Sequence, residues 1–338
     1  MRPFDALSHR GRLPRLRGLA AAALAQYDLP PSRLRVLAHR ANTIFAVTPE
    51  PGPAGPGAAN APLILRIYGP HSPPPEMVAS ELAWLAALGQ ETDLPVPVPV
   101  PTRAGALLGH ATAAGLPAPR QCVLFQAVPG RFVDAGLRPA HLARVGTLMA
   151  QLHTHAAEFS PPPGFVRPRW NWRGVFGASS VFAPGRGGDL LSAGDRAIFT
   201  AAADRIELAM ENRRPDPAGY GLIHADLQQT NYLFDRGTAG AIDFADCCWG
   251  DHLYDMTITL FEVGDRPGGP ALRAAFFDGY RRIRPLPDDY EAGIRLFTAI
   301  RLAKRVNYLA NAPDPAVRAR APGWVAYAAR WLAEFTAR

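Results

Sequence analysis

The sequence predicts an α+β fold of two lobes: a small N-terminal lobe with an antiparallel sheet and a helix, then a larger, mainly helical lobe. Extended apolar segments gather before residue 130, whereas helical periodicity prevails after it. At 338 residues, 48% hydrophobic and 19% charged, the chain is long enough for two lobes with a sizeable core. We place the lobes at 1–129 and 130–338, with Pro129-Gly130 at the boundary.

The chain begins with a basic segment. Five arginines lie between Arg2 and Arg17, ahead of the apolar run GLAAAALAQY from Gly18. We expect a solvated start and then a short amphipathic helix; a targeting segment or a polyanion-binding arm is the alternative. The run is about half the roughly 18–20 residues that a membrane span needs, so no membrane association is expected.

Strands are expected next. LRVLAHRANTIFAVTPE, residues 34–50, and LILRIY, residues 63–68, have strand-like patterns, and a Pro/Gly/Ala-rich loop at 51–62 separates them. Apolar residues then recur at helical spacing over 76–88 and stop at Gly89, which predicts a helix.

Similar sequence patterns predict the elements in the rest of the first lobe and at the start of the second. LPVPVPVP from Leu94 must be an extended connector or an edge, because proline lacks an N–H donor. QCVLFQAVPGR from Gln121 predicts a short buried strand, and HLARVGTLMAQLHTHA from His141 a helix. An irregular stretch to about Gly188 precedes further helices.

The segment LIHADLQQTNYLFD, residues 222–235, places reactive side chains in an apolar setting. Its spacing, H-x-D-x-x-x-x-N, comprises His224, Asp226 and Asn231, and a turn (DRGTAG) and a second apolar stretch (AIDFA) predict a hairpin. With Gly237 at the turn, we expect Asn231 and Asp243 directly opposite each other, their Cβ atoms about 5 Å apart.

This pattern predicts phosphoryl transfer. An asparagine and an aspartate offer the oxygen ligands that Mg²⁺ prefers when substrate phosphates supply the remainder. Asp226, outside the strand, would then accept the proton of a hydroxyl beside the metal-bound phosphate.

At this point the chain resembles the aminoglycoside phosphotransferase and choline kinase family, which has a protein-kinase-like fold. HADLQQTN, AIDFADCCWGDHLYD, LILRIY with SELAWLAAL, and QCVLFQAVPGR carry the resemblance, which covers residues 33–310. It implies an ATP- and Mg²⁺-dependent kinase for the hydroxyl of a small, amine-bearing molecule such as an aminoglycoside, a macrolide, choline or homoserine. The alternatives are a protein serine/threonine kinase on the same fold and a nucleotide-binding pseudokinase scaffold.

The resemblance also implies roles for the motif residues. Asp226 would be the catalytic base or hydroxyl-orienting group, and Asn231 and Asp243 the magnesium ligands. His224 would shape the loop. Asp255 would accept backbone hydrogen bonds that hold the catalytic loop in place.

The nucleotide-binding residues depart from the kinase pattern. Arg66 stands where kinases have a lysine, and a guanidinium also grips phosphate oxygens. Its expected helix partner is Glu81, with Glu76 as the rival; the alternative is an exposed strand arginine.

Two further regions are expected at the nucleotide. Gln126 and Val128 would offer a backbone carbonyl and an N–H to adenine. The phosphate loop, AHRANTIF at 38–45, has no glycine, and Asn42 and Thr43 are the candidates there.

Composition excludes several other functions. The net charge is +7, but the basic residues are spread along the chain without an RNA-binding signature, so no nucleic-acid partner is expected. No Gly-Lys pair exists, which excludes the phosphate loop of P-loop NTPases. An odd count of three cysteines fits a cytoplasmic protein without a disulfide framework.

The segment after Gly237 is acidic. Between Gly237 and Asp265 there is no arginine or lysine, but there are six carboxylates including Asp265. Asp243 and Asp255 would be taken by the metal and the catalytic loop, and we expect the remaining carboxylates to set a negative potential that favours a cationic acceptor; the alternative is that Asp246 and Glu262 are merely solvated. Asp251 is also a plausible helix N-cap, and the seven residues 244–250 leave little room for the peptide platform of protein kinases.

Overall fold

The computed structural model describes residues 4, 7–50, 62–213 and 217–337. The chain divides into two compact units. Unit 1 comprises Met1–Ala135, Glu158–Arg167 and Asn231–Ala245, and unit 2 comprises Gly136–Ala157, Pro168–Thr230 and Asp246–Arg338. The loop expected at 51–62 lies outside the described residues except for Pro62.

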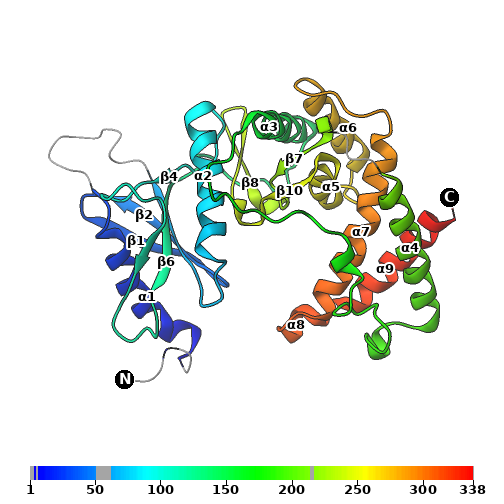
Figure 1. Ribbon diagram of the computed structural model, residues 1–338, viewed down its shortest axis with the longest axis horizontal. Helices are drawn as coiled ribbons and strands as arrows, with labels where there is room; N and C mark the ends of the chain where they lie inside the picture. Colours follow the sequence, from blue (N-terminus) through cyan, green and yellow to red (C-terminus); the bar gives the residue numbers. More distant parts are fainter. Residues whose placement is uncertain (1–3, 5–6, 51–61, 214–216, 338) are drawn as a thin grey trace. The chain divides into compact units, whose positions relative to one another are not determined.

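Unit 1 contains an antiparallel sheet with a helix on each face (Figure 1). The sheet order is β1-β2-β3-β6-β4, with β5 also paired to β6. Its helices are α1 (His9–Leu24) and α2 (Pro75–Glu91). Its strands are β1 (Ser32–His39), β2 (Thr43–Pro49), β3 (Leu63–Ile67), β4 (Pro99–Val100), β5 (Gly109–Ala111) and β6 (Arg120–Gln126). The proline-rich connector therefore supplies β4 at the sheet edge, as its missing N–H donors predict.

Helix α1 covers one face of this sheet. Leu19 and Ala20 of α1 share a buried core with Phe45, Leu65 and other apolar residues of the strands. The helix begins at its N-cap Ser8, well before Gly18, so it extends into the segment expected to be a solvated start. An amphipathic helix can hold arginines on its outer face while the opposite stripe is buried, which explains the longer helix.

A hairpin from far along the sequence completes unit 1. It consists of β8 (Tyr232–Asp235) and β9 (Thr238–Ala241). The backbones of Arg131 and Phe234 exchange hydrogen bonds of 3.1 and 3.0 Å. Gly130 permits this approach, because a Cβ there would lie 2.8 Å from the Phe234 backbone. On the other strand, the Ala241 N–H donates to the Pro95 carbonyl at 3.0 Å.

Unit 2 is mainly helical (Figure 1). Its helices are α3 (Pro139–Glu158), α4 (Ala193–Asn212), α5 (His252–Val263), α6 (Gly269–Arg281), α7 (Tyr290–Ala310), α8 (Pro315–Arg318) and α9 (Ala321–Thr336). A short antiparallel pair, β7 (Tyr220–Ile223) and β10 (Cys248–Asp251), leads into α5. Helix α5 packs against α7 and α6, and α4 and α7 both pack against α9. Within the described residues, no helix is both long and apolar enough to cross a membrane.

Candidate active site

The residues expected at the site fall into two groups, one in each unit. Unit 1 holds the candidate nucleotide and metal residues. Unit 2 holds the candidate base and its supporting side chains.

In unit 1, Arg66 and Glu81 form a buried ion pair. Strand periodicity turns Arg66 away from Leu65 and Ile67, which face α1, and toward α2. There Arg66 Nη1 donates to Glu81 Oε1 at 2.8 Å, and the two side chains are 8% and 2% exposed. Glu81, rather than its rival Glu76, is the partner, and Arg66 is not an exposed strand arginine.

Two further groups lie at Arg66. Its Nη2 lies 3.7 Å from Asp243 Oδ1, and its Nη1 donates to the Tyr68 hydroxyl at 3.2 Å. Burial acts to lower the pKa of Arg66, but Glu81, Tyr68 and Asp243 raise it on balance. Burial raises the pKa of Tyr68 to about 12, so its hydroxyl stays neutral beside the guanidinium. Unit 1 therefore brings a fixed positive charge next to an exposed carboxylate.

The hairpin register differs from the sequence expectation. The pairing Asp235↔Thr238 makes the turn two residues long, and both turn residues, Arg236 and Gly237, have positive φ. Continuing this register places Asn231 opposite Ile242, whose N–H donates to the Asn231 carbonyl at 2.9 Å. Asp243 is not directly opposite Asn231. Asp243 instead follows the strand, with φ 65°. The expected pairing fails because the turn centre falls between Arg236 and Gly237 and not on Gly237.

The donor set at this end of the hairpin fits magnesium. Asn231 is 7% exposed, whereas the Asp243 side chain is 56% exposed and accessible to a ligand. No group of three or more His, Cys, Asp and Glu residues within the described ranges is arranged to hold a metal. Mg²⁺ needs no such cage, because one or two protein oxygens suffice when phosphates and water complete its shell.

The candidate phosphate-loop residues make contacts inside the protein. The Gly69 N–H donates to Asn42 Oδ1 at 3.3 Å, and Thr43 Oγ1 lies 2.9 Å from His39 Nδ1. Thr43 is buried and Asn42 partly exposed. These bonds brace the β1–β2 turn, and only Asn42 keeps surface for a ligand.

The candidate adenine-binding residues lie at the end of β6. The Gln126 N–H donates to the Val98 carbonyl at 2.8 Å, and the Ala127 N–H to the Pro62 carbonyl at 3.0 Å. Val128 follows, partly buried. The structure thus places both residues where the sheet ends.

In unit 2, the catalytic loop is held by a buried carboxylate. Asp255 Oδ2 accepts from the His224 N–H at 3.1 Å, and its Oδ1 from the Ala225 N–H at 2.8 Å. His224 Nδ1 accepts in turn from the Asp226 N–H at 3.2 Å. Ala225 has φ 64°, a strained conformation for a residue with a Cβ, which these bonds support. Gln228 Nε2 donates to Asp226 Oδ2 at 3.1 Å.

The sequence motif did not reveal the layer beneath Asp255. His153 of α3 places Nε2 3.1 Å from Asp255 Oδ2 and Nδ1 2.9 Å from the Tyr280 hydroxyl. The ring of His252 stacks on that of His153 at 3.9 Å, and burial lowers the pKa of His252. His153 is the first histidine of LHTHA, and its place in the helical pattern indicates only a core residue. The packing of α3 against α5 and α6 shows that it also orients Asp255.

Asp255 should make stability depend on pH. Burial acts to raise its pKa, but hydrogen bonds and charge from His153, with His224 and the Ala225 N–H, lower it on balance. Its contribution is therefore full above the unfolded value of about 3.9 and is lost as pH falls through the lower folded pKa. We expect Asp255→Asn to cost about 1–3 kcal/mol at neutral pH, because two buried N–H groups lose their charged acceptor.

Urea unfolding at several pH values checks this. The difference between wild type and Asp255→Asn should shrink as pH falls below about 4. Asp204→Asn, on an exposed face of α4, is the control and should show little difference at any pH. A difference for Asp255→Asn that does not change with pH would contradict the assignment.

Most carboxylates of the acidic segment have a basic side chain beside them. Four of its six carboxylates lie beside a basic side chain: Asp243 beside Arg66, Asp251 beside Arg213, Asp255 beside His153 and Glu262 beside Arg305. Asp265 accepts from the Tyr327 hydroxyl at 2.5 Å. The basic partners come from distant segments, so a count along the sequence overestimated the negative potential. Asp251 is the N-cap of α5, as expected, and accepts from the Leu253 N–H.

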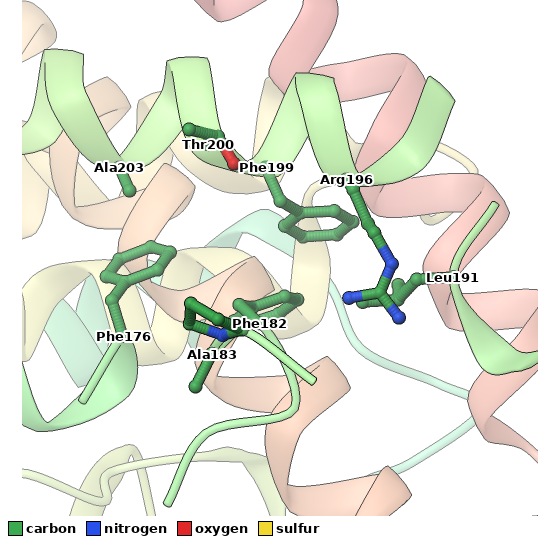
Figure 2. A pocket seen from close by; sticks show the side chains of 9 residues that line it. Phe176, Phe182, Ala183, Leu191, Arg196, Phe199, Thr200 and Ala203 are labelled. Carbon is green, nitrogen blue, oxygen red and sulfur yellow. The ribbon is translucent and has the colours of Figure 1, made fainter. Parts of the chain in front are cut away.

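The irregular segment that precedes α4 lines a small apolar pocket with this helix (Figure 2). Its volume is about 130 Å³, and the rings of Phe182 and Phe199 stack at 4.4 Å. Arg196 at its edge donates to the carbonyls of Arg186 and Gly188. With its one guanidinium occupied and its volume below that of a typical ligand site, this pocket serves the packing of α4.

Comparisons with known proteins show the family to which this chain belongs. A family model described as the phosphotransferase enzyme family matches residues 33–293. A homoserine kinase from Neisseria meningitidis serogroup B is 33% identical over 151 residues, 44% of this chain and 46% of that protein. The chain thus spans less than half the length of this relative. A homoserine kinase from Afipia carboxidovorans is 31% identical over 252 residues, 71% of each chain.

Solved structures show the same fold. A microcompartment-associated aminopropanol kinase is 28% identical, with a TM-score of 0.74 over 94% of this chain and 98% of that one. An amicoumacin kinase in complex with AMP-PNP and Ca²⁺ is 20% identical, with a TM-score of 0.77 over 96% of each chain. The expected protein-kinase-like architecture is confirmed. The chain belongs to the phosphotransferase enzyme family and is a small-molecule phosphotransferase of that family.

Proposed function

We propose that this protein transfers the γ-phosphate of ATP to the hydroxyl of a small acceptor that carries an amine, either an amino alcohol or a hydroxy amino acid. The observation that carries the proposal is the catalytic loop. Asp226 is held through His224 and a buried Asp255, on the loop that continues into Asn231. A carboxylate fixed in this way can orient a hydroxyl and receive its proton.

The reaction follows from these groups. The acceptor oxygen attacks the γ-phosphorus, an O–P bond forms, and the bond from phosphorus to the β,γ-bridging oxygen breaks. The hydroxyl proton passes to Asp226 Oδ1 or Oδ2, and ADP leaves with the bridging oxygen. Gln228, which donates to Asp226 Oδ2, keeps the carboxylate in one orientation.

The nucleotide would be held by unit 1 residues. Arg66 would donate to phosphate oxygens, with Glu81 fixing its direction, and the Gln126 carbonyl and Val128 N–H would meet the adenine. Asn42 would contact the phosphates from the β1–β2 turn. Asn231 and Asp243 would hold Mg²⁺, which when bound neutralises phosphate charge.

The acceptor class rests on the named relatives. Homoserine and aminopropanol both carry a hydroxyl and an amine, and kinases of both are similar to this chain over most of its length. The short connection from Asp243 to Asp251 argues against a peptide acceptor. It consists of a 3₁₀ turn, Phe244–Asp246, and β10, which pairs with β7. We infer a cytoplasmic protein, since Cys122, Cys247 and Cys248 are buried thiols.

ADP release tests this function. The protein is incubated with ATP, Mg²⁺ and one acceptor at a time: homoserine, amino alcohols, choline, aminoglycosides, macrolides, sugars or a serine-containing peptide. We expect ADP release above the acceptor-free rate with at least one amine-bearing alcohol, and none after chelation of Mg²⁺ with EDTA. Turnover of the peptide alone, or of sugars alone, would refute the proposal.

A further inference from the structure

A hydrogen bond links the catalytic loop of unit 2 to helix α5, and an ion pair links α5 to α7. The Thr259 hydroxyl of α5 donates to the carbonyl of Leu227, the residue after Asp226, at 2.6 Å. Glu262 lies one turn further along α5, on the same side of the helix. Its Oε1 accepts from Arg305 of α7 at 2.7 Å, and both side chains are about a quarter exposed, at 26% and 25%.

Arg301 lies one turn before Arg305 on α7. Its side chain is largely buried, with 8% of the residue exposed, and its Nε has no hydrogen-bond partner among the described residues. Its guanidinium carbon lies 5.9 Å from the centre of the Phe261 ring, and no carboxylate pairs with it in the described part of the chain. A buried guanidinium without an anion is unfavourable. A negatively charged group bound beside Arg301 would therefore be stabilised.

A third arginine adds to the positive charge. Burial lowers the pKa of Arg305, and the charges of Arg301 and Arg320 lower it further, whereas Glu262 and Asp226 act in the opposite direction. Arg305 is thus influenced by two further guanidiniums and by two carboxylates, and its ion pair with Glu262 is the direct contact among them.

Space for a ligand exists beside this cluster. A pocket of about 410 Å³ is lined by Asp265, Arg320, Gly323, Trp324 and Tyr327. The indole of Trp324 lies 5.4 Å from the Arg305 guanidinium carbon and stacks on Phe261 at 6.0 Å. Arg320 thus lines the pocket, and Trp324 lies between the pocket and Arg305.

We propose that Arg301 and Arg305 recognise a carboxylate on the acceptor, and that Glu262 accepts from its ammonium, so that the acceptor is an α-amino acid with a side-chain hydroxyl. The inference rests on the proposed function and narrows its acceptor class. A guanidinium forks onto both oxygens of a carboxylate, which an amino alcohol lacks. Arg305 occupies only Oε1 of Glu262 among the described residues, and Oε2 remains for an ammonium.

Three matched acceptors test this. Homoserine has the hydroxyl, the amine and the carboxylate; 3-aminopropan-1-ol lacks only the carboxylate, and 4-hydroxybutyrate lacks only the amine. We expect wild-type kcat/KM for homoserine to exceed that for 3-aminopropan-1-ol by about 10- to 100-fold, the range of one or two charged hydrogen bonds. Arg301→Gln should remove most of this preference by lowering homoserine turnover alone.

The controls separate recognition from folding and from nucleotide binding. Arg295→Gln changes another arginine of α7, which donates to the Glu334 carbonyl, and should leave the preference intact. Arg301→Lys keeps the charge without the fork and should fall between wild type and Arg301→Gln. Homoserine binding measured by calorimetry without nucleotide should weaken in Arg301→Gln, while the KM for ATP stays unchanged.

Three outcomes would overturn the inference while the proposed function stands. These are equal use of homoserine and 3-aminopropan-1-ol by the wild type, ADP release only with acceptors that lack a carboxylate, and an effect of Arg301→Gln on the KM for ATP alone. The last would assign the cluster to a nucleotide phosphate. Failure of every alcohol to stimulate ADP release would instead refute the proposed function.

Discussion

Replacement of Asp226 by asparagine is expected to lower kcat by about 10²- to 10⁴-fold and to leave ATP binding unchanged. A positioned proton acceptor contributes a factor of this size, and an amide of the same shape cannot take the proton. The backbone of the loop should persist, because Asp255 and His224 hold it through main-chain N–H groups. Single-turnover kinetics with saturating ATP and acceptor measure the effect.

Two measurements test whether a loss of folding or of ATP binding explains the lower turnover. The melting temperature and the ATP affinity of Asp226→Asn should match those of the wild type. Asp204→Asn, the exposed α4 control, should retain full turnover. If Asp226→Asn kept a turnover within a few-fold of the wild type, Asp226 would have no role in the chemical step.

Removal of Glu81 should have the largest effect on stability. The side chains of Arg66 and Glu81 are 8% and 2% exposed, so Glu81→Ala leaves a buried guanidinium without its nearest carboxylate, which typically costs about 3–5 kcal/mol. Glu81→Gln keeps an oxygen acceptor for Arg66 and should cost less. The free energy of unfolding in urea, followed by far-ultraviolet circular dichroism, measures both.

A second ion pair of unit 1 provides the control. Arg33 and Glu50 lie 3.4 Å apart with side chains 85% and 49% exposed, so Glu50→Ala should change stability by no more than about 1 kcal/mol. The double variant Arg66→Met, Glu81→Leu removes both charges and should regain much of the lost stability while losing ATP affinity. Equal losses in the free energy of unfolding for Glu81→Ala and Glu50→Ala would show that the buried Arg66–Glu81 pair does not stabilise the fold.

Local patterns were enough to predict the main strands and helices, but not β5, β10 or the start of α1. Alternating apolar residues in β2 and β3, proline in the connector before β4, and the apolar spacing of α2 and α3 each express a rule that acts over a few residues. The Arg66–Glu81 pair was expected from the family resemblance, and the structure confirms it. The motif from His224 to Asn231 identified the reaction class, because phosphoryl transfer needs a carboxylate base and oxygen ligands at close spacing.

Spacing was less reliable at the hairpin. The turn centre lies half a residue from the position assumed. The residue opposite Asn231 is therefore Ile242 and not Asp243. Turn type depends on the φ angles of Arg236 and Gly237, which pattern alone does not specify.

The sequence by itself determined the order of the elements, the family and the candidate base, because these depend on short-range periodicity and on one compact motif. The tertiary structure alone decided the electrostatics. Glu262 and Asp255 appear in an acidic stretch of sequence, but Arg305 of α7 forms an ion pair with Glu262, and His153 of α3 forms a hydrogen bond with Asp255, both from segments far along the chain. Arg301 becomes notable only when α7 buries it without a carboxylate. Charge interactions depend on distance in space, which a linear pattern does not contain.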